Sequence, residues 1–251
     1  DILINAAAYN DVDRAESEFE LANKINGYAV GSLAQICRDI DMPIVHYSTE
    51  YVFDGTKREG YREDDEPRPV SAYGRSKLLG EEELKKNADK FYLIRLSRLF
   101  GSTSPDLRSP SPGLERGRGE VETRGKKSFV EIMLDLAKTR SEIEVVDEEL
   151  SCPTFAPDLA KQTKYITEHK LPFGIYHATN KGACTWYEFA KAIFEIAKRN
   201  VKLIPVPSSR FPRAAKRPKY GILLNTKLPP MRSWQEALEE FLISNFQFSK
   251  K

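Results

Sequence analysis

Short apolar runs alternate with long helical patterns through the first half of this chain, and this alternation constrains the fold more than any other feature. Runs that suit buried strands occupy residues 1–5, 42–47 and 91–96. Patterns with apolar residues at helical spacing occupy residues 16–40 and 71–86 between them. Strands separated by helices of this length predict βαβ units with right-handed crossovers, and hence a parallel sheet covered by helices on both faces.

The second half continues the mixture with shorter elements. A helix is expected over residues 129–138, and strands over 143–146 and 174–178. The segments Thr185-Trp-Tyr-Glu188 and Ser233-Trp-Gln-Glu236 have the spacing of capping boxes. In a capping box the hydroxyl and the glutamate satisfy each other's backbone N–H groups, so we expect a helix to begin at each of these segments.

Residues 101–127 interrupt this rhythm, because they are rich in Ser, Pro, Gly and Arg and hold almost no apolar side chains. A segment of this length without a pattern of its own is expected to be disordered or to form a lid. We find no internal repeat that would indicate a solenoid.

The bulk properties exclude several classes of function. The 39 basic and 37 acidic side chains nearly balance, so the net charge gives no reason to expect nucleic acid or a membrane as partner. No apolar run approaches the roughly 20 residues that span a bilayer. Cys37, Cys152 and Cys184 are widely spaced, which predicts reduced thiols in a cytoplasmic protein. His46 and His177 show no metal-ligand spacing and are expected to be packing residues, so no metal is predicted.

The pair Tyr73 and Lys77 is the central chemical observation. Positions i and i+4 of a helix lie one above the other, and a nearby ammonium lowers the pKa of a phenol. Such a pair can move a proton near neutral pH. The spacing alone is weak evidence, because with 11 tyrosines in 251 residues about one such pair is expected by chance. A second copy, Tyr187 and Lys191, has no polar strand end before it, and we interpret it as structural.

The surroundings distinguish the first pair from the second. Ser48 and Thr49 follow an apolar strand, and ligands bind at the carboxyl edge of open parallel sheets. Their hydroxyls could polarise a carbonyl beside Tyr73, although a simple strand-end turn is the alternative. The small residues Ala6-Ala-Ala8 close the first strand in the same way and would let a flat ligand approach the backbone, or would serve a tight helix–strand junction.

Several segments resemble a known family in order and at similar spacing. They are Asn5-Ala-Ala-Ala-Tyr-Asn-Asp-Val-Asp-Arg-Ala-Glu16, His46-Tyr-Ser-Thr-Glu-Tyr-Val-Phe-Asp-Gly55, Tyr73-Gly-Arg-Ser-Lys77, Cys152-Pro-Thr154, Thr185-Trp-Tyr-Glu-Phe189 and Lys216-Arg-Pro218. Together these segments closely resemble the dTDP-4-dehydrorhamnose reductases, a family of extended short-chain dehydrogenases/reductases. The resemblance extends over nearly the whole chain.

The resemblance implies a reductase that uses NADPH or NADH to reduce the C4 keto group of a dTDP-linked 6-deoxyhexulose. By resemblance, Tyr73 donates the proton, Lys77 holds the nicotinamide ribose and tunes Tyr73, and Thr49 bonds to the reacting carbonyl. The positions that match cofactor-contacting residues of the family are Ala6, Ala7, Ala8, Tyr47, Tyr73 and Lys77. The positions that match or replace substrate-contacting residues are Thr49, Glu50 and Arg98.

The chain departs from the family pattern at four points. No Gly-rich phosphate-binding turn occurs among its 14 glycines. Because the segment Asn5-Ala-Ala-Ala8 matches a later strand of the family, we expect this turn to lie upstream of Asp1. Glu50 stands where the family usually has Asp. Arg98 replaces a substrate-contacting Trp and could grip a diphosphate through both of its terminal nitrogens. The segment 101–127 is longer than the usual connection.

A basic cluster lies in a Pro-containing loop near the C-terminal end. It consists of Arg210, Arg213, Lys216 and Arg217. The cluster could attract a nucleotide diphosphate, with Arg217 as a substrate contact, or it could be a solvated basic loop; the sequence favours neither.

These observations predict an α/β fold with a Rossmann-type doubly wound parallel sheet. Residues 1–150 are expected to form the NAD(P)-binding core and residues 151–251 mostly a small α/β substrate-binding lobe. The expected substrate is dTDP-4-dehydro-L-rhamnose, and a homodimer is expected. The alternative is a non-catalytic NAD(P)-binding regulatory subunit that resembles the beta subunit of methionine adenosyltransferase. Retention of Tyr73 and Lys77 favours the enzyme.

Overall fold

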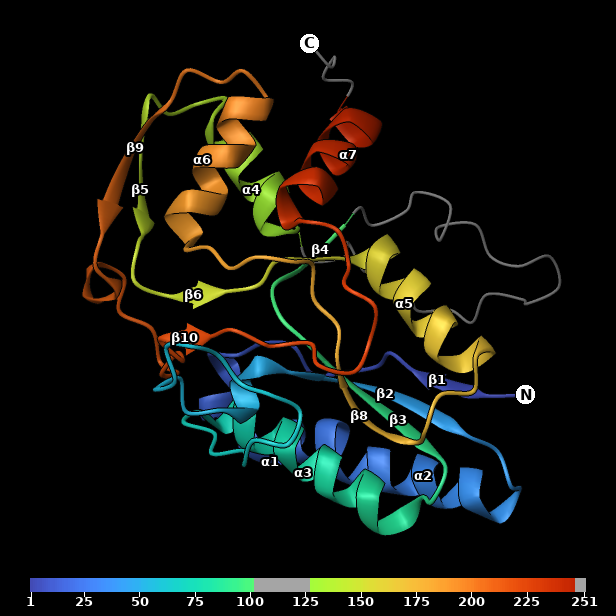
Figure 1. Ribbon diagram of the computed structural model, residues 1–251. Helices are drawn as coiled ribbons and strands as arrows, with labels where there is room; N and C mark the ends of the chain where they lie inside the picture. Colours follow the sequence, from blue (N-terminus) through green and yellow to red (C-terminus); the bar gives the residue numbers. More distant parts are fainter. Residues whose placement is uncertain (102–126, 247–251) are drawn as a thin grey trace, which may run out of the picture.

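The computed structural model describes residues 1–101 and 127–246 (Figure 1). The segment predicted as a lid or disordered, 101–127, lies outside the described residues except for its two ends.

A parallel sheet forms the lower part of the molecule as seen in Figure 1. Within the described residues it has four strands in the order β1-β2-β3-β8, and every neighbouring pair is parallel. The bounds are β1 Leu3–Asn5, β2 Ile44–Thr49, β3 Phe91–Leu96 and β8 Gly174–His177. The predicted strands and the parallel sheet are therefore confirmed, with small shifts at their ends.

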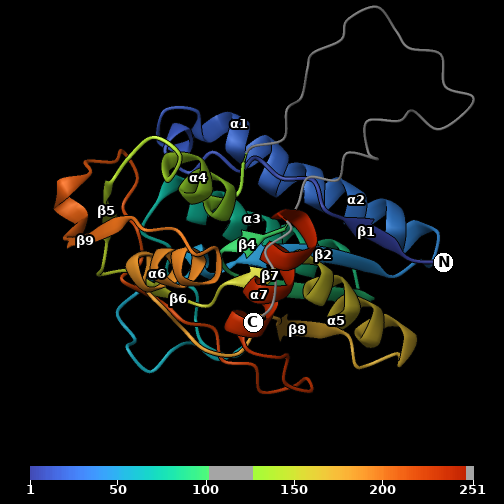
Figure 2. The ribbon, with the colours of Figure 1, turned by 90° about the horizontal axis from the view of Figure 1, so that it is seen from above.

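Helices cover both faces of this sheet (Figures 1 and 2). The helices α2 (Ala29–Asp39) and α3 (Ala72–Asn87) lie on one face, and α5 (Ala156–Glu168) lies on the other. Alternation along β2 explains this arrangement, because successive side chains of a strand point to opposite faces. Ile44 packs into the core beneath α2 and α3, whereas Val45 packs into the core beneath α5.

The helix predicted over 16–40 is divided into several pieces. Their bounds are η1 Arg14–Glu16, α1 Phe19–Asn23, a π-helical segment η2 Lys24–Tyr28, and α2. The π-helical segment holds Asn26 in a buried position, where its side chain bonds to both backbone groups of Tyr9 and to Oγ of Ser76. These contacts tie the loop after β1 to α3, so the irregular turn helps to position both.

Gly80 allows α3 to approach the π-helical segment closely. A Cβ at this position would lie 2.0 Å from the backbone oxygen of Asn26, and a backbone group cannot move aside cheaply. We therefore expect Gly80→Ala to lower the free energy of unfolding by roughly 1–3 kcal/mol through overpacking, although alanine is the better helix former. Gly31→Ala is the matched control in chemical denaturation, because its nearest obstacle is the flexible end of Glu83. Equal losses for the two variants would contradict this account.

A second layer lies above the carboxyl edge of the main sheet (Figure 1). It contains α4 Phe129–Leu136, β5 Glu142–Val146, α6 Trp186–Ile196, β9 Lys202–Val206 and α7 Trp234–Phe246. The two capping boxes are confirmed, with Thr185 bonded to Glu188 and Ser233 to Glu236. Short two-residue strands connect the layers: β4 Leu99–Phe100, β6 Leu150–Ser151, β7 Thr154–Phe155 and β10 Tyr220–Gly221.

The polypeptide crosses between the two layers more than once. β8 belongs to residues 151–251 but pairs with β3 of the main sheet. β5 belongs to residues 1–150 but pairs with β9 of the second layer. The two layers consequently hold each other in place, and the space between them is built from both halves of the sequence.

Candidate active site

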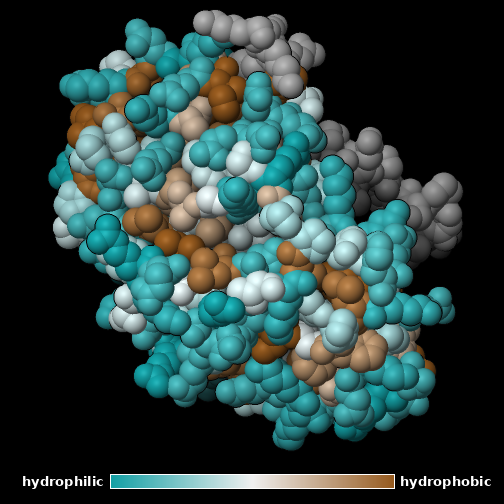
Figure 3. Space-filling view, in the orientation of Figure 1, coloured by the Kyte–Doolittle hydropathy of each residue, from teal (hydrophilic) through white to brown (hydrophobic). Residues whose placement is uncertain are grey.

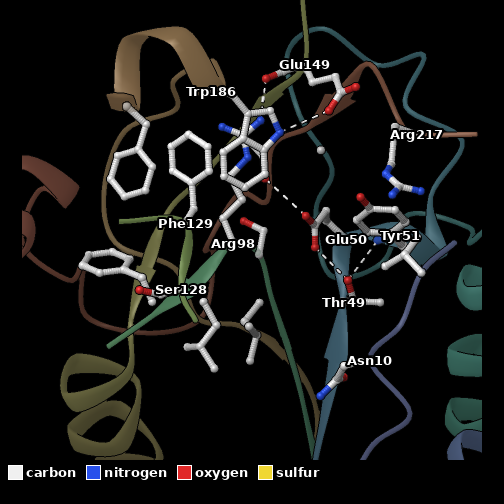
Figure 4. A pocket seen from close by; sticks show the side chains of 18 of the residues that line it. Asn10, Thr49, Glu50, Tyr51, Arg98, Ser128, Phe129, Glu149, Trp186 and Arg217 are labelled. Atoms are coloured by element: carbon white, nitrogen blue, oxygen red, sulfur yellow. Dashed lines mark hydrogen bonds between the residues drawn. The ribbon is translucent and has the colours of Figure 1, made fainter. Parts of the chain in front are cut away.

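A cavity of about 1060 Å³ lies between the carboxyl edge of the main sheet and the second layer. Apolar side chains are visible along the waist between the two layers (Figure 3). In the close view, Thr49, Glu50 and Tyr51 face Trp186, Phe129 and Arg98 across the cavity (Figure 4). The predicted site residues that line it are Ala6, Ala8, Tyr47, Thr49, Glu50, Tyr73, Lys77, Arg98 and Arg217. Ala7 is exposed and is not among the lining residues.

The first turns of α3 bring Tyr73 and Lys77 into the cavity. Ser71 caps the helix by accepting a hydrogen bond from the Gly74 backbone N–H at 3.1 Å. Both side chains are buried, and Nζ of Lys77 donates to the backbone oxygen of Tyr47 at 2.7 Å. Burial lowers the pKa of Lys77 to about 8, because desolvation disfavours the charged form. Lys77 therefore changes protonation close to neutral pH.

The pKa of Tyr73 differs from the sequence-based expectation. We expected Lys77 to lower it, but burial raises it, and the negative charge of Glu50 raises it further. The expectation was wrong because desolvation of the buried phenol, which disfavours the phenolate, is the largest influence on this pKa. A raised pKa keeps the phenol of Tyr73 protonated at neutral pH, which is the state that a proton donor needs.

Thr49 and Glu50 stand at the carboxyl end of β2. Thr49 is the last residue of the strand. Its Oγ1 donates to Oε2 of Glu50 at 2.7 Å, and Oγ1 also accepts a hydrogen bond from the Tyr51 backbone N–H at 3.2 Å. Ser151 donates to the other oxygen of Glu50 at 3.4 Å. Burial raises the pKa of Glu50 to about 7 despite these hydrogen bonds. A carboxyl group that titrates near neutral pH therefore lies directly beside Thr49.

Glu50 should make stability depend on pH. Its pKa is raised in the folded protein, so its stabilising contribution is fully present below the unfolded value near 4.5 and is lost as pH rises through about 7. A shift of this size corresponds to about 3 kcal/mol. We expect Glu50→Gln to remove this loss, so that the variant gains stability relative to wild type from about pH 5 to about pH 8.

Urea denaturation across that pH range measures this gain. Glu20→Gln removes one exposed negative charge and is the control that should follow wild type. A constant difference between Glu50→Gln and wild type at every pH would contradict the raised pKa.

Arg98 lines the cavity but is bonded to the protein itself. Its terminal nitrogens donate to the backbone oxygens of Cys184 at 2.7 Å and Glu149 at 2.5 Å, and its guanidinium lies 4.0 Å from the ring centre of Trp186. The predicted grip on a diphosphate would require these bonds to break. Arg98 instead ties the end of the main sheet to the second layer and presents Trp186 to the cavity.

The basic cluster is divided between the cavity and the surface. Arg213 and Arg217 line the cavity, whereas Arg210 pairs with the partly exposed Glu144 at 2.8 Å. Arg213 forms an ion pair with Glu149, and Arg217 donates to Asp13 at 2.7 Å. Of the four basic residues, Arg213 and Arg217 can therefore reach a bound ligand. Each of these two is paired with a carboxylate.

Sequence reasoning missed several residues of this site. Trp186 and Glu149 line the cavity, and Nε1 of Trp186 donates to Glu149 at 3.2 Å. Asn26 and His46 are not among the residues that line the cavity. Asn26 could have been found as a polar residue on an apolar helix face. His46 is buried, in agreement with a packing residue, and its ring also contacts Asn5 and Lys77.

The second Tyr-x-x-x-Lys pair is structural, as predicted. Tyr187 packs against the core of the second layer. Lys191 is exposed and pairs with Glu195 at 3.9 Å. Tyr187 and Lys191 do not line the cavity described above.

Three further properties bear on function. Across the described ranges, no helix is long and apolar enough to cross a membrane. The same residues contain no group of three or more His, Cys, Asp or Glu arranged to hold a metal ion. Cys37, Cys152 and Cys184 are free and buried.

The fold and this cavity define the class of the protein. Helices lie on both faces of a parallel sheet, and a Tyr-x-x-x-Lys pair meets a strand-end threonine, as in short-chain dehydrogenases/reductases. The family model described as the RmlD substrate binding domain matches residues 1–246, and the chain belongs to this family.

Individual relatives agree with this family. The spore coat polysaccharide biosynthesis protein SpsK of Bacillus subtilis is 35% identical over 96% of this chain and 78% of its own length. A dTDP-4-dehydrorhamnose reductase of Burkholderia thailandensis is 35% identical over 91% of this chain and 74% of its own. The crystal structure of the Bacillus anthracis dTDP-4-dehydrorhamnose reductase in complex with NADP has a TM-score of 0.86 and 36% identity, covering 97% of this chain and 80% of that one. The predicted family is confirmed.

Proposed function

We propose that this protein catalyses the NAD(P)H-dependent reduction of dTDP-4-dehydro-L-rhamnose to dTDP-L-rhamnose. One observation carries the proposal: Tyr73, Lys77 and Thr49 line a single cavity at the carboxyl edge of a parallel sheet, in a member of a family whose relatives are named dTDP-4-dehydrorhamnose reductases. These names also favour an enzyme over the regulatory subunit considered as the alternative.

The residues at the sheet edge fit a nicotinamide cofactor. Ala6 and Ala8 line the cavity without bulky side chains, and Tyr47 and Lys77 stand beside them. The Bacillus anthracis relative was solved with NADP. We propose that Ala6, Ala7, Ala8, Tyr47 and Lys77 hold NAD(P)H. When bound, the cofactor supplies the hydride.

The chain's own residues supply the proton and hold the carbonyl. Tyr73, protonated at neutral pH because its pKa is raised, donates to the oxygen that becomes the sugar hydroxyl. Thr49 carries a hydroxyl at the strand end that can bond to the same oxygen while it accepts negative charge. Lys77 keeps a fixed position through the Tyr47 backbone oxygen.

The substrate is assigned to the opposite wall of the cavity. Trp186 and Phe129 offer aromatic faces, with ring centres 4.5 Å apart. Arg213 and Arg217 can exchange their carboxylate partners for a diphosphate. Glu50 lies where the sugar would meet Thr49, and Arg98 supports this wall from behind Trp186.

The test is turnover of the purified protein, with the segment expected upstream of Asp1 included, with NADPH and dTDP-4-dehydro-L-rhamnose. It is followed by loss of NADPH absorbance and by identification of the sugar product. dTDP-glucose, which lacks the keto group, is the matched control. Oxidation of NADPH only with the keto sugar supports the proposal. Equal rates with both sugars, or no oxidation, would overturn it.

Three further expectations belong to this proposal. We propose that residues 1–150 mainly bind cofactor and that 151–251 mostly bind substrate, with β8 as the part of the latter that joins the main sheet. Free, buried cysteines support a cytoplasmic location. Exposed apolar residues on and next to α1, including Phe19, Leu21 and Tyr28, support a homodimer, which light scattering would detect as twice the chain mass.

A further inference from the structure

A buried chain of hydrogen-bonding groups connects the first strand to Lys77. Asn5 on β1 is the register partner of His46 on β2. Nδ2 of Asn5 lies 3.1 Å from Nδ1 of His46, and Nε2 of His46 lies 3.4 Å from Nζ of Lys77. The three residues are 8%, 1% and 3% exposed. Bulk water therefore has little access to these contacts, and the protein itself must determine where each proton lies.

The backbone of Ala7 decides how the Asn5 amide is oriented. The Ala7 N–H donates to Oδ1 of Asn5 at 3.1 Å, and a backbone N–H can only donate. Reversing the amide would place its NH₂ group against this N–H, so Oδ1 stays toward Ala7 and the NH₂ group points at His46. Nδ1 of His46 must then accept a hydrogen bond. Neutral histidine has one donor and one acceptor nitrogen, so its proton lies on Nε2.

This tautomer matters because Nε2 faces Lys77. A neutral Lys77 amine has a lone pair that can accept the Nε2–H, while one of its own hydrogens bonds to the Tyr47 backbone oxygen. A Lys77 ammonium has three hydrogens and no lone pair, so it meets the Nε2–H as donor against donor. A hydrogen bond to the neutral form of a group disfavours the charged form.

We propose that Asn5 and His46 are positioning residues for Lys77: Asn5 fixes the ring tautomer of His46, and His46 in turn weakens the hold of Lys77 on its proton. The inference rests on the proposed function only for its effect on turnover. The tautomer and the Lys77 titration belong to the protein alone. The lowered pKa of Lys77 agrees with this arrangement.

Other charged groups around Lys77 cannot replace this effect. Glu81, one turn further along α3, favours the charged lysine, and both of its oxygens are bonded to Arg95 on β3. From the end of β2 Glu50 lines the same cavity, and from α3 Tyr73 does so with a protonated phenol. From α5, Thr163 contributes an uncharged hydroxyl bonded to Tyr47. Among these groups, the His46 N–H opposes the lysine charge by direct contact.

Asn5→Asp is the sharpest test, because it reverses the tautomer. A carboxylate accepts on both oxygens, so one would keep the Ala7 bond while the other would accept from Nδ1–H of His46. Nε2 would then carry a lone pair and accept from the Lys77 ammonium. The chain has three histidines, so ¹⁵N spectra of the full chain can be assigned. We expect a protonated Nε2 in wild type and a protonated Nδ1 in Asn5→Asp. A protonated Nδ1 in wild type would overturn the proposal.

The proton affinity of Lys77 is the second readout. We expect its ¹³Cε titration to move upward by about one pH unit or more in Asn5→Asp, as for a hydrogen bond to the charged form replacing one to the neutral form. The new carboxylate also attracts the lysine through space, so the same substitution is made with His46→Phe. The effect of Asn5→Asp on the Lys77 titration is thus measured twice, once with His46 present and once in the His46→Phe chain. A clearly smaller shift without His46 supports coupling through the ring. Equal shifts, or no shift in Asn5→Asp, would overturn it.

Turnover adds a readout that depends on the proposed function. If catalysis needs a protonated Lys77, the alkaline limb of the pH profile of kcat should move to higher pH in Asn5→Asp, together with the titration of Lys77. An unchanged profile together with a shifted titration would place the failure in the role given to Lys77 in catalysis. The positioning by Asn5 and His46 would then still stand on the spectra.

Discussion

Tyr73→Phe should reduce the turnover of dTDP-4-dehydro-L-rhamnose by about 10²–10⁴-fold, the range attributed to a positioned proton donor. Phenylalanine keeps the ring and removes only the hydroxyl, so packing against Tyr51, at 5.5 Å between ring centres, should survive. Cofactor affinity, measured by NADPH fluorescence, should remain within a few-fold of wild type, because Lys77 and the alanines at the sheet edge are unchanged. The loss should therefore appear in kcat rather than in binding.

The second Tyr-x-x-x-Lys pair offers a matched control for this variant. Tyr187→Phe removes a phenol from the same sequence pattern on α6, outside the cavity, and should leave turnover unchanged. Turnover of Tyr73→Phe close to wild type would remove Tyr73 as the proton donor. Equal losses for the two variants would indicate a general effect on the fold.

The local patterns in the sequence were sufficient for the main sheet and for half of the site. Thr49, Tyr73 and Lys77 could be predicted because a strand end and an i, i+4 helix pair are short-range features. The three strands of the first half were confirmed because each is a short apolar run, and β2 and β3 are largely buried on both faces.

The other half of the site depends on contacts that no local pattern contains. Glu149, Trp186 and Arg213 meet only because β5 pairs with β9 and folds the second layer over the sheet edge. β9 itself was not predicted, because Pro205 lies within it and proline is rare in strands. Arg98 was predicted to contact the ligand, because no sequence pattern indicates that its partners are two backbone oxygens.

The π-helical segment is another feature that the local sequence pattern did not predict. Residues 16–40 have an apolar pattern that predicts one helix, but the side chain of Asn26 bonds to the loop after β1 and to α3. The bulge lets one polar side chain satisfy three partners in a buried place. Such a distortion follows from tertiary contacts and not from helical periodicity.

Arg95→Met should be the most destabilising of the variants considered, with a loss of about 3–5 kcal/mol in the free energy of unfolding. Arg95 and Glu81 are 1% and 0% exposed, and two bonds of 2.9 Å and 2.6 Å connect them. Ser48 also donates to Glu81 at 2.6 Å. Removing Arg95 leaves the Glu81 carboxylate buried without its counter-charge, and the cost of an uncompensated buried charge exceeds that of the lost contacts.

The double variant Arg95→Met, Glu81→Met separates the cost of an orphaned charge from the value of the pair. Both charges are then absent, so its loss should be well below the sum of the two single losses. The ion pair of Arg210 and Glu144 lies near the surface and gives the baseline, because solvent screening makes such pairs weak and Arg210→Met should change stability little. Single losses at Arg95 or Glu81 as small as this baseline would show that the buried pair does not hold α3 on the sheet. Because Tyr73 and Lys77 lie on the same helix, a large loss would show that this ion pair stabilises the helix that carries two of the active-site residues.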